Sequence, residues 1–161
     1  MSSLLLRRAT PSDVPVLLSL IRALATYERA PDAVLATEAD LLRDGFGATP
    51  RYFATLAELE GKPAGFSLWF FNYSTWLGRA GIYLEDLFVL PELRGKGVGR
   101  ALLADLARVA LEEKCGRVDW AVLNWNEPAI AFYERIGAKK MSGWFTMRVE
   151  GEDSLRTLAG G

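Results

Sequence analysis

The chain of 161 residues contains no histidine and one cysteine, Cys115. The lack of histidine excludes Ser-His-Asp and Cys-His catalysis and histidine-based metal sites within this chain, and we expect no metal centre. One cysteine cannot form an intramolecular disulfide. Because Cys115 follows an apolar helical pattern, we interpret it as a packing residue. Acid–base chemistry would therefore fall to carboxylates, tyrosines or water held by them.

The chain also lacks a charge excess and a long apolar run. Lys and Arg number 19 against 20 Asp and Glu, which does not favour a nucleic-acid or membrane partner. No run approaches the ~18 apolar residues of a transmembrane helix, and Leu4–Leu6 is too short for a signal peptide. We therefore expect a cytoplasmic protein. Half of the residues are hydrophobic, enough for one core, so we predict a single domain over residues 1–161.

Hydrophobic periodicity and turn residues predict an alternating order of strands and helices. We predict strands at 4–8, 51–59, 64–73, 82–90, 117–123 and 140–149. Helices are predicted after Thr10-Pro11, from Thr37 to about Gly45, from 98 to about 110 and from 126 to 136, with a helical tail at 153–158. This order is typical of an α/β domain with a mixed sheet.

A basic glycine-rich loop lies between the predicted strand 82–90 and the helix that follows it. Its residues are Arg94, Gly95, Lys96, Gly97, Val98, Gly99 and Arg100. Glycines let backbone N–H groups approach an anion, and a helix N-terminus adds donors and a positive dipole end. The loop matches neither a Walker A sequence nor G-x-G-x-x-G. It is either a pyrophosphate site or a turn that serves only the backbone geometry.

Arg94-x-x-Gly97-x-Gly99 matches the Arg/Gln-x-x-Gly-x-Gly/Ala acetyl-CoA motif of the GNAT superfamily, and residues 126–138 resemble the second signature of that family. The resemblance implies a mostly antiparallel, twisted sheet flanked by helices. It also implies direct attack of an amine on acetyl-CoA in a ternary complex. The implied contacts to acetyl-CoA are Leu87, Phe88, Val89, Arg94, Gly95, Lys96, Gly97, Val98, Gly99, Arg100, Asn126, Pro128, Ala129, Tyr133 and Arg135.

Further segments resemble the diamine acetyltransferase branch, which includes spermidine/spermine and thialysine N-epsilon-acetyltransferases. They are residues 27–28, 44–47, 73–76, 83–86 and 125–128. The polyamine enzymes carry an aspartate where this chain has Ser74, and a long polycation favours several carboxylates along its path. We therefore expect a small amine substrate, a thialysine-like amino acid ahead of a polyamine. Arg79 either pairs with a carboxylate of that substrate or is a surface arginine after a turn.

The same branch implies a homodimer with its sites near the subunit interface. Candidate surfaces are the aromatic run 69–71 and the apolar side chains Phe145 and Val149. The branch also implies substrate contacts at Tyr27, Glu28, Trp76 and Glu85.

Glu85 is the candidate base. It lies in an otherwise apolar strand directly before the glycine-rich loop, where a carboxylate faces either a cleft or an ion pair. In a regular strand the adjacent Asp86 would point to the opposite face, so a bulge or a partner must serve one of the two. The resemblance implies that Glu85 accepts a proton from the amine through water.

Tyr133 is the candidate acid, since a phenol with a pKa near ~10 is protonated and can donate to a leaving thiolate. Its alternative is an aromatic core position. Asn126 is either a helix cap, a ligand of the pantetheine arm, or both.

Two rival functions remain open from the sequence. One is acetylation of protein or peptide amines, and the other is a non-catalytic acyl-CoA-binding module. The presence of both Glu85 and Tyr133 counts against the second.

Overall fold

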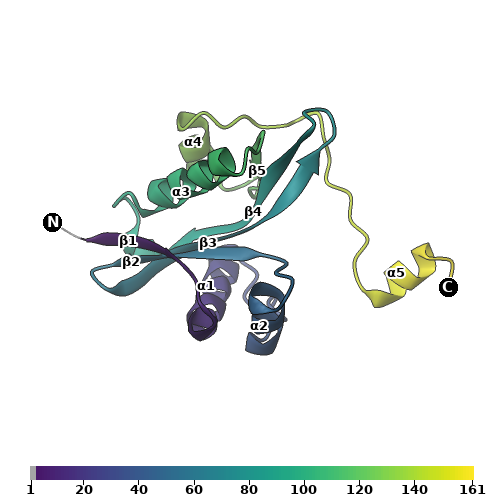
Figure 1. The fold of residues 1–161 in the computed structure, drawn as a ribbon, viewed down its shortest axis with the longest axis horizontal. Coiled ribbons are helices and arrows are strands. Elements are labelled where there is room, and N and C mark those ends of the chain that lie inside the picture. Colours follow the sequence, from purple (N-terminus) through teal and green to yellow (C-terminus); the bar gives the residue numbers. More distant parts are fainter. Residues whose placement is uncertain (1–2) are drawn as a thin grey trace. The chain divides into compact units, whose positions relative to one another are not determined.

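The computed structural model describes residues 3–161 in two compact units, one ending at Leu123 and the other beginning at Asn124. The first unit contains one five-stranded sheet in the order β1-β2-β3-β4-β5 (Figure 1). Its strands are β1 Leu4–Arg8, β2 Phe53–Leu59, β3 Lys62–Ser74, β4 Arg79–Val89 and β5 Val118–Trp120. The β4–β5 pair is parallel and all other pairs are antiparallel, which confirms the predicted mixed, mostly antiparallel sheet.

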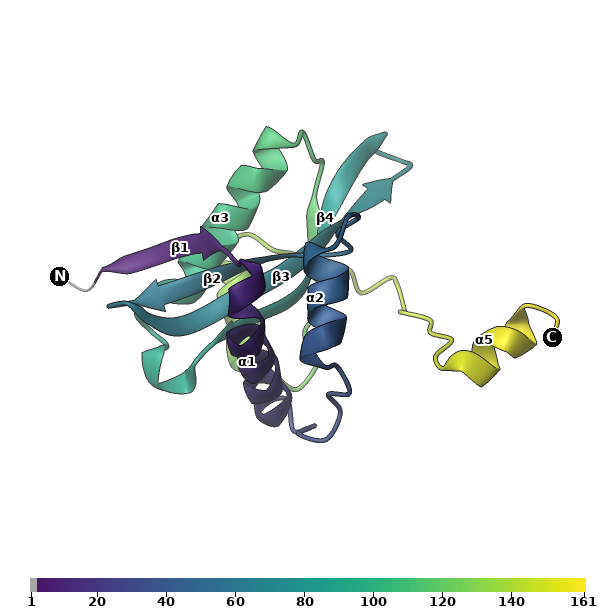
Figure 2. The ribbon, with the colours of Figure 1, turned by 60° about the horizontal axis from the view of Figure 1, so that its bottom comes forward.

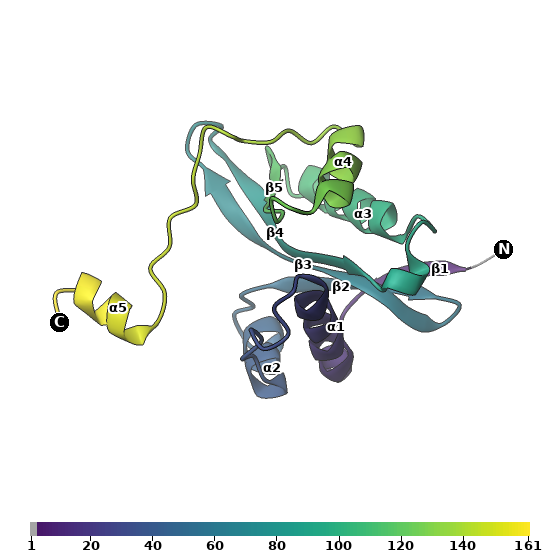
Figure 3. The ribbon, with the colours of Figure 1, turned by 180° about the vertical axis from the view of Figure 1, so that it is seen from behind.

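Helices cover both faces of this sheet. α1 (Val14–Tyr27) and α2 (Glu38–Phe46) lie side by side on one face, and α3 (Val98–Glu112) lies on the other (Figures 1, 2 and 3). The helix starts follow the predicted signals: Thr37 caps α2 by accepting from the Asp40 N–H, and the left-handed Gly97 precedes α3.

Each face carries its own apolar core. On the α1 face, Leu17 and Leu18 pack with Leu56, Phe66 and Phe88. On the α3 face, apolar side chains of the helix pack against the sheet in two clusters. The first contains Val98 and Leu102 of α3 with Ala57 and Ala64. The second contains Leu106 and Ala110 of α3 with Trp69, Ile82 and Leu84. Each fully buried Leu or Val contributes about 1.5–3 kcal/mol of transfer free energy, so these stripes hold the helices to the sheet.

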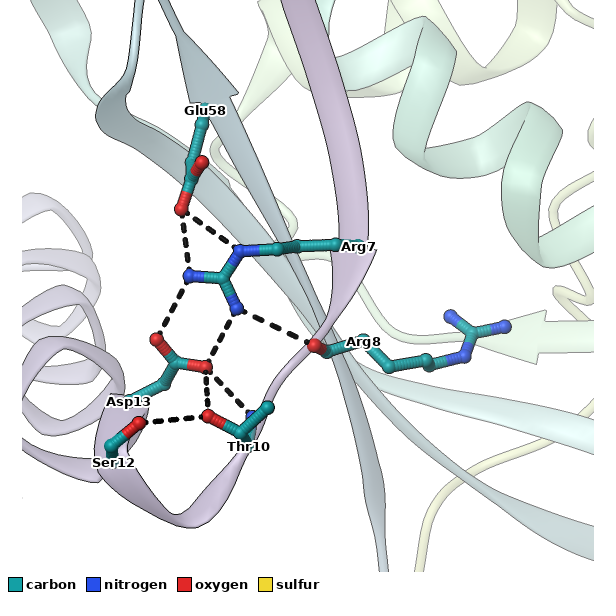
Figure 4. Close-up of polar contacts among 6 residues, drawn as sticks. All are labelled: Arg7, Arg8, Thr10, Ser12, Asp13 and Glu58. Atoms are coloured by element: carbon teal, nitrogen blue, oxygen red, sulfur yellow. Dashed lines mark hydrogen bonds and ion pairs between the residues drawn. The ribbon is translucent and has the colours of Figure 1, made fainter.

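An ion-pair network joins β1 to the start of α1 (Figure 4). The Arg7 guanidinium donates to both carboxylate oxygens of Asp13, at 2.7 and 2.9 Å, and its Nε and Nη2 donate to Glu58 Oε1 at 3.0 and 2.7 Å. Asp13 also accepts from the Thr10 N–H at 2.7 Å. The hydrogen bonds from Arg7 hold the pKa of Asp13 well below its usual range. The network fixes the entry to α1, whose far end reaches the candidate site.

The second unit contains α4 (Glu127–Arg135) and α5 (Glu152–Leu158). The helical tail was predicted correctly. The predicted strand 140–149 was wrong: the described residues of this segment form no strand, and Phe145 and Met147 are about nine-tenths exposed. A strand is stabilised by pairing with a neighbour, and this segment joins no ladder within residues 3–161. The predicted strand 117–123 is shortened to β5, which pairs with β4 over three residues.

No helix among residues 3–161 is long and apolar enough to cross a membrane.

Candidate active site

A β-bulge interrupts β4 at Glu85. Leu84 pairs with Trp69 on β3, and Asp86 pairs with the adjacent Leu68. Glu85 is therefore an extra residue that has no paired position on β3. The ladder to β5 ends at Leu84, one residue before the bulge. The sequence predicted either a bulge or a partner for one of the adjacent carboxylates Glu85 and Asp86, and the structure shows the bulge.

The bulge changes which side chains of β4 face each helix layer. Leu84 and Leu87 both pack in the core under α3, although an odd spacing would separate them in a regular strand. Phe88 packs in the opposite core, under α1. The two carboxylates between Leu84 and Leu87 are thus left out of the core under α3. Glu85 is exposed, whereas Asp86 is partly buried.

Asp86 is electrostatically coupled to two other carboxylates. Its burial and the negative charges of Glu85 and Glu28 raise its pKa to about 7. Glu28 is half-buried, and burial raises its pKa too. A carboxyl group that titrates near neutral pH can accept a proton from a substrate at that pH. The sequence analysis assigned no role to Asp86. The only sequence feature that pointed to it was its position next to Glu85 in an apolar strand, which requires a bulge or a partner.

The end of α1 places Tyr27 and Glu28 at this acidic group. Arg29 adopts a left-handed conformation, with φ of 63°. The Ala30 N–H donates to the Ala25 carbonyl, and the Arg29 N–H donates to that of Thr26. This pair of hydrogen bonds is the Schellman motif, which closes a helix in one defined geometry. The Tyr27 ring packs on Phe88 of β4, with centroids 6.4 Å apart.

The glycine-rich loop follows β4 and opens α3. Gly95 and Gly97 have φ of 76° and 82°, and a Cβ at either position would meet nothing within 4 Å. Val98 is buried under the helix, whereas Lys96 and Arg100 are exposed. Open space at the glycines, a helix N-terminus and cationic side chains together suit a pyrophosphate. The loop thus fits the phosphate end of acetyl-CoA.

The second group of predicted residues lies on α4 in the second unit. Asn126 is buried, and its Oδ1 accepts from the Ala129 N–H at 3.4 Å, which confirms its role as the helix cap. Pro128 stands in the first turn, where its missing N–H costs nothing. Tyr133 is half-buried beside Phe132, with ring centroids 5.6 Å apart, and Arg135 is the last residue of α4.

Trp76 and Arg79 lie at the turn of the β3–β4 hairpin. Trp76 is 88% exposed, and Arg79 lines a surface hollow with Lys114 and Cys115. Arg79 and Glu85 are six strand residues apart, roughly 20 Å. The structure therefore brings Tyr27, Glu28, Glu85 and Asp86 together near the glycine-rich loop, but not Trp76 or Arg79 of the same chain. Within residues 3–161, no group of three or more Cys, Asp and Glu side chains is placed to hold a metal ion.

The chain is similar to known proteins in sequence and in structure. The acetyltransferase (GNAT) family model matches residues 17–138. Thialysine N-epsilon-acetyltransferase of Bos taurus is 42% identical over 171 residues, covering 99% of both chains. Spermidine/spermine N(1)-acetyltransferase-like protein 1 of Homo sapiens is 36% identical over 93% of this chain and 23% of its own length. Among solved structures, an integron cassette protein from the mobile metagenome of V. cholerae has a TM-score of 0.82 at 28% identity, covering 99% of both chains.

Proposed function

The chain belongs to the GNAT family of acetyltransferases, and we propose that it transfers an acetyl group from acetyl-CoA to a primary amine of a small molecule. The expected substrate is a thialysine- or lysine-like amino acid, ahead of a diamine or polyamine. The observation that carries this proposal is the acidic group of Glu28, Glu85 and Asp86 beside a pyrophosphate-type loop. The Bos taurus relative, similar over nearly the whole chain, supports the choice of amine.

The acidic group suits an amine with a second polar or charged centre. An alkyl ammonium is mostly protonated at neutral pH, so it is attracted by carboxylates and must lose a proton before it attacks. Asp86, with a pKa of about 7, and exposed Glu85 lie on consecutive positions of the bulge and share the proton-accepting role, directly or through water. Glu28 draws the distal ammonium.

The transfer is balanced by three proton movements. The carboxylate pair receives the proton that the ammonium loses before it attacks. The neutral nitrogen bonds to the acetyl carbon, the carbon–sulfur bond breaks, and the Tyr133 hydroxyl supplies a proton to the leaving sulfur. The nitrogen then loses a second proton, which restores the Tyr133 hydroxyl directly or through water. Gly95, Gly97 and Gly99, with Lys96 and Arg100, hold the pyrophosphate. Backbone groups of Leu87, Phe88 and Val89 hold the pantetheine arm, while Asn126, Pro128, Ala129 and Arg135 complete the cofactor contacts from α4.

A homodimer belongs to the same proposal. The segment around Phe145 and Val149 exposes large apolar side chains, and Phe71 is 40% exposed, whereas Trp69 is buried in its own subunit. Apolar surface of this kind is typical of subunit interfaces. The exposed Trp76 is remote from Glu85 of its own chain, so it would contact substrate only at the site of a second copy.

The proposal also includes a single domain and a cytoplasmic location. The single domain is supported by the family model, which spans the boundary at residue 123, and the cytoplasmic location by the use of acetyl-CoA.

The proposal is tested by measuring CoA release with thialysine, spermidine and a lysine-containing peptide. We expect turnover with the small amines. Turnover confined to the peptide would indicate a protein acetyltransferase, and acetyl-CoA binding without any turnover would indicate a binding module.

A further inference from the structure

The side chain of Arg94 turns back from the glycine-rich loop onto the amine side of the sheet. Its Nε donates to the Val89 carbonyl oxygen at 3.0 Å. Its guanidinium carbon lies 4.2 Å from the centroid of the Tyr27 ring and 5.6 Å from that of Phe88. The first residue of the acetyl-CoA motif therefore contacts the end of α1.

The guanidinium contacts two aromatic rings at once. The Phe88 ring, on β4, is 3% exposed and packs at a tilt against that of Tyr27. Tyr27 directly precedes Glu28, whose charge contributes to raising the pKa of Asp86. Arg94, Tyr27 and Phe88 thus form one contact cluster, which joins the glycine-rich loop to the end of α1.

We propose that Arg94 is a positioning residue, which holds Tyr27 in the amine-binding geometry and thereby couples amine binding to acetyl-CoA binding. This inference rests on the proposed function. When the pyrophosphate orders the loop, it also orders the guanidinium above Tyr27, so the amine meets a wall that is already fixed. Such coupling is reciprocal: bound amine strengthens acetyl-CoA binding by the same factor.

The backbone geometry explains why Arg94 is available for this task. The hydrogen bond to Val89 anchors the side chain on β4, and the backbone N–H groups of Gly95 and Gly97 with the charges of Lys96 and Arg100 are left to bind phosphate. The motif accepts Gln in place of Arg at this position. Gln keeps a donor for the Val89 carbonyl but removes the cation from the Tyr27 ring, so Arg94→Gln separates the two roles.

The test is a double-substitution cycle on the amine KM, using thialysine and saturating acetyl-CoA. Arg94→Gln should raise the amine KM about two- to fivefold, the range of an exposed cation–π contact. It should add nothing further in a Tyr27→Leu background, where the ring is absent. In a Tyr27→Phe background, which keeps the ring, the effect of Arg94→Gln should persist. Arg100→Gln removes the same charge from the loop without this contact and should act alike in all three backgrounds.

Thermal unfolding without ligand checks that each variant is folded. If wild-type protein turns over amines but Arg94→Gln and Tyr27→Leu act independently on the amine KM, the positioning role is overturned while the proposed function stands. A lower amine KM in Arg94→Gln would also overturn it, since Arg94 would then hold Tyr27 away from the substrate. If wild-type protein turns over no amine, the proposed function fails and the positioning role fails with it.

Discussion

The carboxyl group of Asp86, on β4, lies near enough to that of Glu28, at the end of α1, for the charge of Glu28 to raise the pKa of Asp86. Burial is the larger cause, and together with Glu85 these effects bring that pKa to about 7. A buried carboxyl group with a raised pKa lowers the free energy of unfolding at neutral pH. Costs of this kind are concentrated at functional sites.

Asp86→Asn should therefore stabilise the protein above neutral pH. In wild type the folded state holds a proton on Asp86 that the unfolded chain has already lost at pH 5, so the free energy of unfolding falls as pH rises toward 7. The slope is about 1.4 kcal/mol per pH unit. We expect the variant to gain about 2–3 kcal/mol over wild type between pH 5 and pH 8 in urea denaturation, while amine turnover falls. If the free energies of unfolding of variant and wild type differed by the same amount at pH 5 and at pH 8, Asp86 would be ionised throughout this range.

Glu85→Gln should lower the rate most at neutral pH. The substitution keeps the shape of the side chain but removes its charge, so the proton of the ammonium has a poorer acceptor. At pH 7 we expect kcat/KM to fall by about 100-fold, and the loss should shrink as pH approaches the pKa of the amine, near ~10. A variant as active as wild type at pH 7 would leave Asp86 as the base.

Tyr133→Phe should lower kcat by about 100-fold and leave acetyl-CoA binding nearly unchanged, because the phenol acts only on the charge that develops on sulfur. Tyr73→Phe, on the exposed hairpin, is the matched control and should keep wild-type kcat. If kcat of Tyr133→Phe stays within a factor of about two, water or another group is the donor.

Gly97→Glu should abolish acetyl-CoA binding in calorimetry. The side chain would force a strained left-handed backbone, with φ of 82°, and would place a negative charge in the phosphate cradle. Gly99→Ala is the control: its added Cβ would meet Val89 at 3.7 Å, an ordinary contact, so binding should change by no more than about twofold. Equal affinities for the wild type and Gly97→Glu would remove the cofactor assignment from this loop.

Local patterns predicted most of the fold because each element carries its own signal. The Thr37 cap, the glycine-rich start of α3 and the apolar stripe of that helix are short-range features, and all appear in the structure. The strand predicted at 140–149 was wrong because a strand depends on a partner, which composition does not supply.

The site was predictable in its residue types but not in its electrostatics. Two adjacent acids in β4 indicated a bulge, yet the pKa of Asp86 depends on Glu28, which is distant in the sequence and is brought near by the packing of α1 on the sheet. The Arg94–Tyr27 contact is likewise set by tertiary packing, so no sequence pattern indicated it.

The substrate assignment is tested most directly by a competition in which wild-type protein acetylates equal concentrations of thialysine and spermidine in one vessel. The ratio of acetylated products gives the ratio of the two kcat/KM values. Ser74 pairs with Arg79 at the hairpin and is as remote from Glu85 as Arg79 is, so the preference rests on the acidic group itself. Glu85 and Asp86 serve the reacting amine, and Glu28 serves one distal charge. The account predicts that acetyl-thialysine is the main product. Acetyl-spermidine in large excess would contradict it.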